Sequence, residues 1–158
     1  MKIIMGSDLY GFALKESIKE YLRNNGYEVS DCGVDDREQE TPYYRIAGSA
    51  AKQITDGKFE RGILVCGTGM GMSIIANKHR GIYASVCESV FAAEKSRSIN
   101  NSNVLTLGSM VTTESVARGI VDVWLKTEFT QGWDSSIKDW LRNSLGDIDS
   151  LEEEKFNS

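Results

Sequence analysis

The chain has 158 residues, of which 41% are hydrophobic and 26% charged, and its formal net charge at pH 7 is -5. This length and composition fit one globular domain with its own core and exclude a disordered or fibrous chain. No apolar run approaches the roughly 18 residues that a membrane span needs, and the start M-K-I-I-M-G-S-D becomes polar too early for a signal peptide. We therefore expect a cytoplasmic protein that does not bind a membrane.

Most of the negative charge lies at the end of the chain. The last twelve residues contain five acidic residues and one lysine, so the rest of the chain is nearly neutral. We interpret residues 146–158 as a solvated acidic tail that follows a single domain of residues 1–145. Because the body has no basic run, we expect no nucleic-acid partner.

Apolar runs alternate along the chain with stretches of helical periodicity. Strands are expected at residues 2–5, 27–32, 63–66, 81–87 and 104–107, and helices at residues 12–22, 46–54, 90–98, 113–129 and 135–145. A further helix is expected after the glycines at 67–71, running to about residue 78. Helices of this length between strands require right-handed crossovers, which predicts a parallel sheet covered on both faces. In such sheets the ligand binds beyond the carboxyl ends of the strands.

The stretch at residues 62–78, G-I-L-V-C-G-T-G-M-G-M-S-I-I-A-N-K, is the most informative part of the sequence. It is typical of a buried strand that ends at Cys66, a glycine turn, and the first turns of a helix. Backbone N–H groups and a helix N-terminus favour negative charge above such a turn. The thiol of Cys66 points into the same space and could act there as a base or nucleophile.

This stretch also has less specific interpretations. Cys66 could simply end a core strand, since cysteine is often buried, and the glycines could serve a tight turn without a ligand. A dinucleotide fingerprint with Glu88 as the ribose-binding acid is a further alternative. The third glycine of that fingerprint would fall at Met72, which argues against it.

Two other segments contain candidate polar ligands for a small molecule. Asp8 ends the first strand, where its carboxylate could accept sugar hydroxyls or move protons, or could cap the helix that starts near Gly11. The run Asn-Asn-Ser-Asn at residues 100–103 could supply amide donors to a polyol, or could be an ordinary turn.

The remaining reactive or aromatic side chains point to structural roles. The three cysteines lack a metal-binding spacing, so we expect free thiols and no metal site. The single histidine, His79, is expected in a surface loop and leaves no histidine for a catalytic triad. The late tryptophans are expected in the core or a subunit interface rather than in a sugar-stacking platform; they are Trp124, Trp133 and Trp140.

The pattern as a whole resembles the ribose-5-phosphate isomerase B and galactose-6-phosphate isomerase family over roughly residues 1–145. The residues that carry the resemblance are Gly6-Ser7-Asp8, Gly11-Phe12, Leu14-Lys15, Glu28-Val29, Asp31, Gly33, residues 62–78, Arg97, Asn100, Asn103-Val104-Leu105 and Leu107-Gly108. The resemblance implies a Rossmann-like three-layer α/β/α domain with a five-stranded parallel sheet. It also implies homodimers or homotetramers with shared sites, and no cofactor.

The same resemblance implies interconversion of an aldose and a ketose through an enediolate. By position, Cys66 corresponds to the base that moves a proton between carbons 1 and 2. The glycine turn corresponds to the amide cradle for the enediolate oxygen, with Thr68 beside it. Preorganised donors of this kind stabilise a charge that exists only during the reaction. The other positions implied are Gly67, Gly69 and Gly71 in the cradle, Asp8, Tyr43 and Asn100 as hydroxyl contacts, and Arg97 in substrate binding.

Six positions depart from the family pattern. Leu9 and Ile99 stand where the family has histidines, the latter associated with ring opening, and Asp134 stands at the place of another histidine. Arginines that bind phosphate would fall at Met110, Trp133 and Ile137. Because these residues cannot supply forked cationic donors, the usual phosphate cage is missing.

Three explanations of the missing cage stay open. The substrate could be a free or deoxy sugar whose far end packs on these side chains. A phosphate could instead be held by Arg97, Lys138 or Arg142, or by a paralogous partner subunit. The chain could also be a non-catalytic sugar-binding or assembly subunit. Because Cys66 and its cradle are intact, we expect an active isomerase, and without a histidine at position 99 we expect short sugars that stay open-chain, or a low turnover.

Overall fold

A five-stranded, all-parallel sheet in the order β2-β1-β3-β5-β4 forms the centre of the protein. The computed structural model describes residues 1–36 and 40–156. The strands are β1 (Lys2–Ser7), β2 (Glu28–Asp31), β3 (Arg61–Cys66), β4 (Ala84–Val86) and β5 (Val104–Gly108). The helices are α1 (Phe12–Asn24), α2 (Tyr43–Thr55), α3 (Met70–Ala76), α4 (Val90–Ser98), α5 (Glu114–Lys126) and α6 (Ser135–Phe156).

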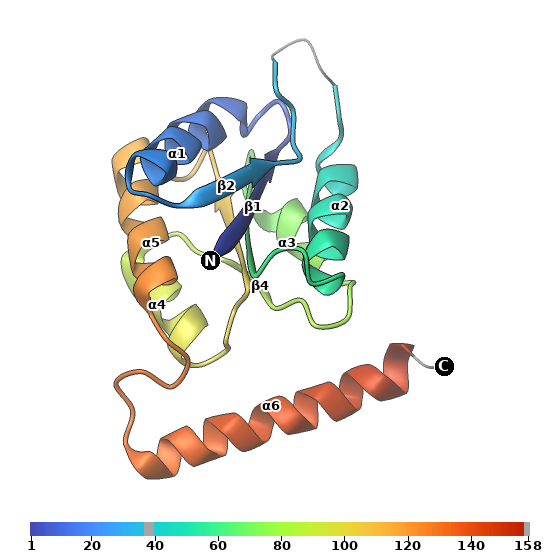
Figure 1. Ribbon diagram of the computed structural model, residues 1–158, viewed down its shortest axis with the longest axis vertical. Coiled ribbons are helices and arrows are strands. Elements are labelled where there is room, and N and C mark those ends of the chain that lie inside the picture. The colour runs from blue at the N-terminus through green and yellow to red at the C-terminus, as the bar shows by residue number, and fades with distance from the viewer. Residues whose placement is uncertain (37–39, 157–158) are drawn as a thin grey trace.

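Helices cover both faces of the sheet (Figure 1). Helices α1, α4 and α5 pack on one face, in a core that includes Ile3, Met5 and Trp124. Helices α2 and α3 pack on the other face, in a core that includes Ile4 and Cys66. Successive strand residues alternate between the two cores, which explains why the central strands are apolar throughout. The predicted three-layer α/β fold with a five-stranded parallel sheet is confirmed.

Several predicted boundaries are wrong. Helix α2 begins at Tyr43, directly after Pro42, rather than at residue 46, and α5 ends at Lys126 rather than at residue 129. Strand β4 comprises only Ala84–Val86 within the predicted 81–87. These differences arise at element ends, where apolar periodicity fades and capping decides the boundary.

The largest difference concerns the acidic segment, which continues helix α6 instead of leaving it at residue 145. Three of its acids bond to the segment before β4. Asp149 accepts from the Tyr83 hydroxyl at 3.1 Å, Glu152 from the Gly81 N–H at 2.9 Å, and Glu153 pairs with Arg80 at 2.9 Å. These contacts tie the end of α6 to the body, although nearly all residues from 146 to 156 remain exposed. In the described residues, no helix is long and apolar enough to cross a membrane.

Candidate active site

Two adjoining hollows lie at the carboxyl ends of β1 and β3. The first, which we name the Cys66 hollow, has a volume of about 360 Å³ and is lined by Asp8, Tyr10, Tyr43, Cys66, Gly67, Thr68, Gly71 and Met110. The second, the Leu9 hollow, has a volume of about 380 Å³ and is lined by Asp8, Leu9, Tyr10, Glu40, Thr41, Pro42 and Tyr43. They share three residues, so a ligand bound beside Cys66 can extend from one into the other.

The glycine turn between β3 and α3 lacks side chains because its neighbours leave no room for them. Gly69 has φ +79°, and a Cβ there would lie 3.0 Å from the backbone carbon of Leu107. A Cβ on Gly71 would lie 2.6 Å from the ring of Tyr43. The turn can therefore pack against β5 and carry the Tyr43 ring only if both positions are glycine.

The sulfur of Cys66 lies at the start of this turn. Cys66 is the last residue of β3 and is only 5% exposed. Its Sγ accepts the N–H of Gly69 at 3.1 Å. This donor fixes the direction of the thiol and points at the sulfur lone pairs, which are the electrons that a thiolate base uses to take up a proton.

Asp8 is placed both to cap a turn and to meet a ligand. Its Oδ1 accepts the N–H of Gly11 at 3.0 Å, immediately before α1. Burial raises the pKa of Asp8, and hydrogen bonds from the backbone of Gly11 and Tyr10 oppose this increase. Asp8 lines both hollows, so the capping and ligand-binding interpretations are compatible. A carboxyl group with a raised pKa is better suited to exchange protons near neutral pH.

Most of the predicted catalytic and cradle residues come together in the Cys66 hollow. They are Asp8, Tyr43, Cys66, Gly67, Thr68 and Gly71, and Gly69 contacts the sulfur itself. The hydroxyl of Thr68 accepts the N–H of Met70 at 3.4 Å, which leaves its proton free to be donated elsewhere.

Arg97 and Asn100 line neither hollow. Arg97 is 6% exposed, and its guanidinium donates to the carbonyls of Thr127 (3.3 Å) and Ser102 (2.6 Å) and to the side chain of Asn101 (3.0 Å). Burial, assisted by the charge of Arg61, lowers the pKa of Arg97 to about 10. Within one chain this arginine joins the end of α4 to the segment after α5, which is a structural role. Asn100 is exposed just after α4.

The six departures from the family pattern divide into two groups. Leu9 and Met110 line the two hollows. Ile99, Trp133, Asp134 and Ile137 do not, and Asp134 instead caps α6 by accepting the N–H groups of Ser136 and Ile137 at 2.9 and 3.1 Å. Helix α6 bonds to residues that precede β4 and extends along the end of the domain opposite the carboxyl ends of the strands (Figure 1). A single chain therefore does not bring these four residues to Cys66.

Sequence reasoning missed part of the wall of the site. Tyr10, Glu40 and Thr41 line the Leu9 hollow, and none was predicted. Ser109 donates its hydroxyl to the carbonyl of Tyr10 at 2.8 Å, which joins the loops after β1 and β5. Tyr10 could have been predicted, because it follows the first strand and the loops after parallel strands converge at the same edge of the sheet.

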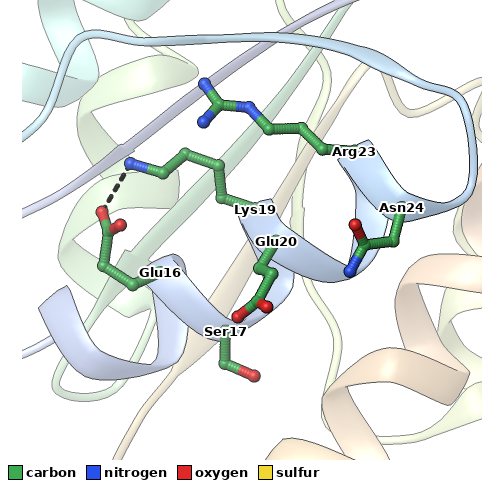
Figure 2. Close-up of a pocket in the computed structure, with 6 residues that line it drawn as sticks. All are labelled: Glu16, Ser17, Lys19, Glu20, Arg23 and Asn24. Atoms are coloured by element: carbon green, nitrogen blue, oxygen red, sulfur yellow. Dashed lines mark hydrogen bonds and ion pairs between the residues drawn. The ribbon is translucent and has the colours of Figure 1, made fainter.

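A third hollow lies along α1 (Figure 2), and none of its lining residues lines the Cys66 hollow or the Leu9 hollow. Its lining comes from that helix alone: Glu16, Ser17, Lys19, Glu20, Arg23 and Asn24. Lys19 is bound to Glu16 and Asp31, each at 2.6 Å. The hollow is a groove along one helix that is lined by charged and polar side chains, and the described residues that line it include no cysteine or histidine. In the described part of the chain no three His, Cys, Asp or Glu residues gather as metal ligands would.

Comparison with known proteins identifies the family. The family model for Ribose/Galactose Isomerase matches residues 3–139. The chain is 44% identical over 153 residues to the 4-deoxy-4-sulfo-D-erythrose isomerase of Clostridium sp. (strain MSTE9). This alignment covers 97% of this chain and 96% of that protein. It is 39% identical over 132 residues to the D-erythrulose-4-phosphate isomerase of Pectobacterium atrosepticum. That alignment covers 84% of this chain and 87% of the relative.

A solved structure agrees with this result. Ribose-5-phosphate isomerase B from Clostridium thermocellum matches with a TM-score of 0.89 at 39% identity, over 98% of this chain and 99% of that chain. The expected family and its enzymatic class are thereby confirmed. The chain belongs to the ribose/galactose isomerase family and is a sugar isomerase.

Proposed function

We propose that this isomerase interconverts the aldose and ketose forms of a four-carbon sugar that carries an anionic group at C4, with Cys66 as the base. The observation that carries the proposal is the hollow in which Cys66, the glycine turn and Asp8 meet. This arrangement combines a base, an amide-rich turn and a second proton carrier within one small space, as proton transfer next to a carbonyl requires.

In the proposed reaction the thiolate of Cys66 takes the proton from C2 of the aldose. The electrons of that C–H bond form a double bond between C1 and C2, and the carbonyl electrons become negative charge on O1. Cys66 then returns the proton to C1, while loss of the O2 proton leaves the carbonyl at C2. Asp8 carries the proton between O1 and O2, a role that its raised pKa supports.

The enediolate oxygen is assigned to the backbone amides of the glycine turn. The N–H of Gly69 already bonds to the sulfur of Cys66. The N–H of Met70 bonds to the Thr68 hydroxyl. We therefore assign the oxygen to the remaining amides of the turn, above all that of Gly71 in the first turn of α3, which lacks a partner within the helix. Removal of one such donor typically costs about 10²–10³ in kcat.

The four-carbon substrate follows from the chemistry of ring closure. Ile99 has no group that could move a proton during ring opening, so a substrate that stays open-chain is favoured. An erythrose closes its five-membered ring through O4, and this is impossible when O4 is phosphorylated or replaced by a sulfonate. The two relatives named above act on sugars of this kind, a 4-deoxy-4-sulfo-erythrose and an erythrulose 4-phosphate.

The test follows the C2 proton by NMR in D₂O with three substrates: 4-deoxy-4-sulfo-D-erythrose, erythrose 4-phosphate and ribose 5-phosphate. We expect isomerisation with solvent exchange for at least one four-carbon sugar, and slower turnover of the ring-forming ribose 5-phosphate. The Cys66→Ser variant should lose at least about 10³-fold in kcat, because a hydroxyl is a far weaker base than a thiolate.

The matched control is Cys87→Ser, which makes the same change in a buried cysteine outside both hollows. The Cys87 thiol contacts Ser85 and Ser96, whose oxygens can also bond to a serine hydroxyl. Full exchange in Cys66→Ser would contradict the assignment of the base. Absence of exchange with every substrate, together with sugar binding by calorimetry, would instead support a non-catalytic sugar-binding subunit.

A further inference from the structure

We propose that the anionic end selected by this site is a sulfonate with a single charge rather than a phosphate dianion. The inference rests on the proposed function, because it concerns the C4 group of the same substrate. It is carried by the charges and donors around the two hollows, and it predicts a discrimination between two sugars of equal carbon number.

A four-carbon substrate keeps its anionic end close to Cys66. Three bonds separate C2 from the sulfur or oxygen on C4, a span of about 4 Å with ordinary bond lengths. When C2 lies beside Cys66, the anionic group therefore stays within the two hollows or at their rims. The residues that line them act directly on its charge.

Within one chain, the described residues that line the hollows carry negative charge and no positive charge. Among the described residues that line the hollows, the charged side chains are Asp8 and Glu40, and there is no lysine, arginine or histidine. On the neighbouring helix α1, Lys15 is fully buried and bonds to Asp31 and to the carbonyl of Val34. Lys19 is bound to Glu16 and Asp31.

A phosphate ester carries about -1.5 to -2 charges at pH 7, with a second pKa near 6. A sulfonate carries one charge at any pH from 2 to 12. Repulsion from Asp8 and Glu40 therefore weighs more heavily on the phosphate, and so does the loss of hydration without a cationic partner.

The same walls offer neutral groups that suit a singly charged, weakly basic anion. Tyr10, Thr41 and Tyr43 line the Leu9 hollow. Their hydroxyl groups are hydrogen-bond donors that carry no net charge. The rim is apolar at Leu9, which is 41% exposed, and at Met110, which is 69% exposed. These groups match the C–S bond and the delocalised charge of a sulfonate better than they match a dianion.

The first experiment measures kcat/KM for 4-deoxy-4-sulfo-D-erythrose and erythrose 4-phosphate from pH 6 to pH 8. At pH 7.5 we expect the sulfonate to be favoured at least tenfold. The ratio of phosphate to sulfonate should rise roughly 15-fold between pH 7.5 and pH 6, as the phosphate becomes a monoanion. The titrating groups around the site, Asp8, Glu40, Tyr10, Tyr43 and Cys66, act on both substrates and largely cancel in this ratio.

The second experiment introduces a cation at the rim. A Cβ on Gly67 would lie 3.3 Å from the sulfur of Met110, so this side chain covers the glycine turn. Met110→Arg should shift the phosphate-to-sulfonate ratio at pH 7.5 at least tenfold toward phosphate. Met110→Gln, of similar length without charge, is the control and should leave the ratio within about twofold of the wild type.

The outcomes separate the two proposals. A preference for phosphate at pH 7.5, or a ratio that stays constant with pH, would overturn the charge inference while the isomerase function stands. An unchanged ratio in Met110→Arg with the Met110→Gln control intact would also overturn it. Failure to isomerise either sugar would instead overturn the proposed function.

Discussion

The burial of Asp8 affects the stability of the fold and the proposed activity in opposite directions. Burial raises its pKa, so the folded protein favours the neutral carboxyl group. Its contribution to stability is thus greatest below the ordinary pKa of an aspartate, and it declines as the pH rises through the raised folded-state pKa. At pH 7 the ionised Asp8 therefore lowers the free energy of unfolding.

We therefore expect Asp8→Asn to be at least as stable as the wild type at pH 7 but much less active. The asparagine oxygen can still accept the Gly11 N–H, which is bonded at 3.0 Å, so the turn before α1 should keep its cap. An amide cannot carry a proton between O1 and O2, and kcat should fall at least about 10²-fold. Urea unfolding and the proton-exchange assay measure the two effects, and a loss of stability above about 1 kcal/mol would show that the capping role dominates.

Single site residues could be located from the sequence where the backbone restricts which residue types fit a position. The location of Cys66, Asp8 and the glycines could be predicted because a strand end and a side-chain-free turn must lie at the carboxyl edge of the sheet, whereas their chemical roles stay predictions. Arg97 illustrates the limit. A buried arginine bonded to the carbonyls of Thr127 and Ser102 has the same sequence signature as an arginine that binds an anion.

Helix α1 is fixed to strand β2 by a buried charge network. Lys15 is fully buried, and its Nζ bonds to Asp31 Oδ2 at 2.6 Å. Lys19 bonds to the same carboxylate at 2.6 Å from a more exposed position. Burial alone would raise the pKa of Asp31, but the hydrogen bonds from Lys15 and Lys19 outweigh it and lower the pKa.

This network predicts a pH-dependent loss of stability on the acid side. Because its folded-state pKa is depressed, Asp31 stabilises the fold above the ordinary aspartate pKa of about 3.9, and this contribution is lost as the pH falls through the depressed value. Lys15→Met should destabilise the protein at pH 7 by about 3 kcal/mol, since it leaves part of a buried pair uncompensated.

The measurement is urea unfolding from pH 7 down to pH 3, with Lys19→Met as the matched control. The control removes a partly exposed partner, for which a loss of about 1 kcal/mol or less is expected. If Lys15→Met showed the same stability as the wild type at pH 7, the pair would not be what holds α1 to β2.

Helices and strands whose apolar residues recur at regular spacing could be predicted from the sequence. Segments stabilised by contacts with residues far away in the chain could not. The central strands and α1 were located by periodicity. The last turns of α6 were missed because acidic residues dominate residues 146–156 and obscure the apolar spacing of Ile148 and Leu151. Bonds to Arg80, Gly81 and Tyr83, far away in the chain, help to hold this part of the helix. Tertiary contacts of this kind override local pattern.

For the molecule as a whole, α6 exposes an apolar stripe. Leu141 is the buried residue of this helix. Trp140 is 63% exposed, Leu151 55%, and Ile137 and Ile148 37% each. These positions lie on one face at helical spacing, and α6 extends along the end of the domain instead of packing on the sheet (Figure 1). A stripe of this kind marks an interaction surface.

In the predicted homodimer or homotetramer, a second copy of the chain would cover this stripe. Such an assembly would also explain how Ile99, Trp133 and Ile137, which one chain keeps away from Cys66, could contribute to a shared site. The two observations converge on the same expectation, because the exposed stripe lies on α6, which contains Ile137 and begins shortly after Trp133.

We expect the wild type to be at least dimeric by light scattering after gel filtration. Trp140→Glu should shift it toward the monomer, because a carboxylate buried in an apolar interface has no partner there. Arg142→Gln is the control, since it makes the same change of net charge on the opposite face of the helix. If the site is shared, Trp140→Glu should also lower kcat, and activity should recover as the protein concentration is raised. A wild type that elutes as a monomer, or a Trp140→Glu variant of unchanged size, would contradict an interface at α6 and leave its apolar stripe to another partner.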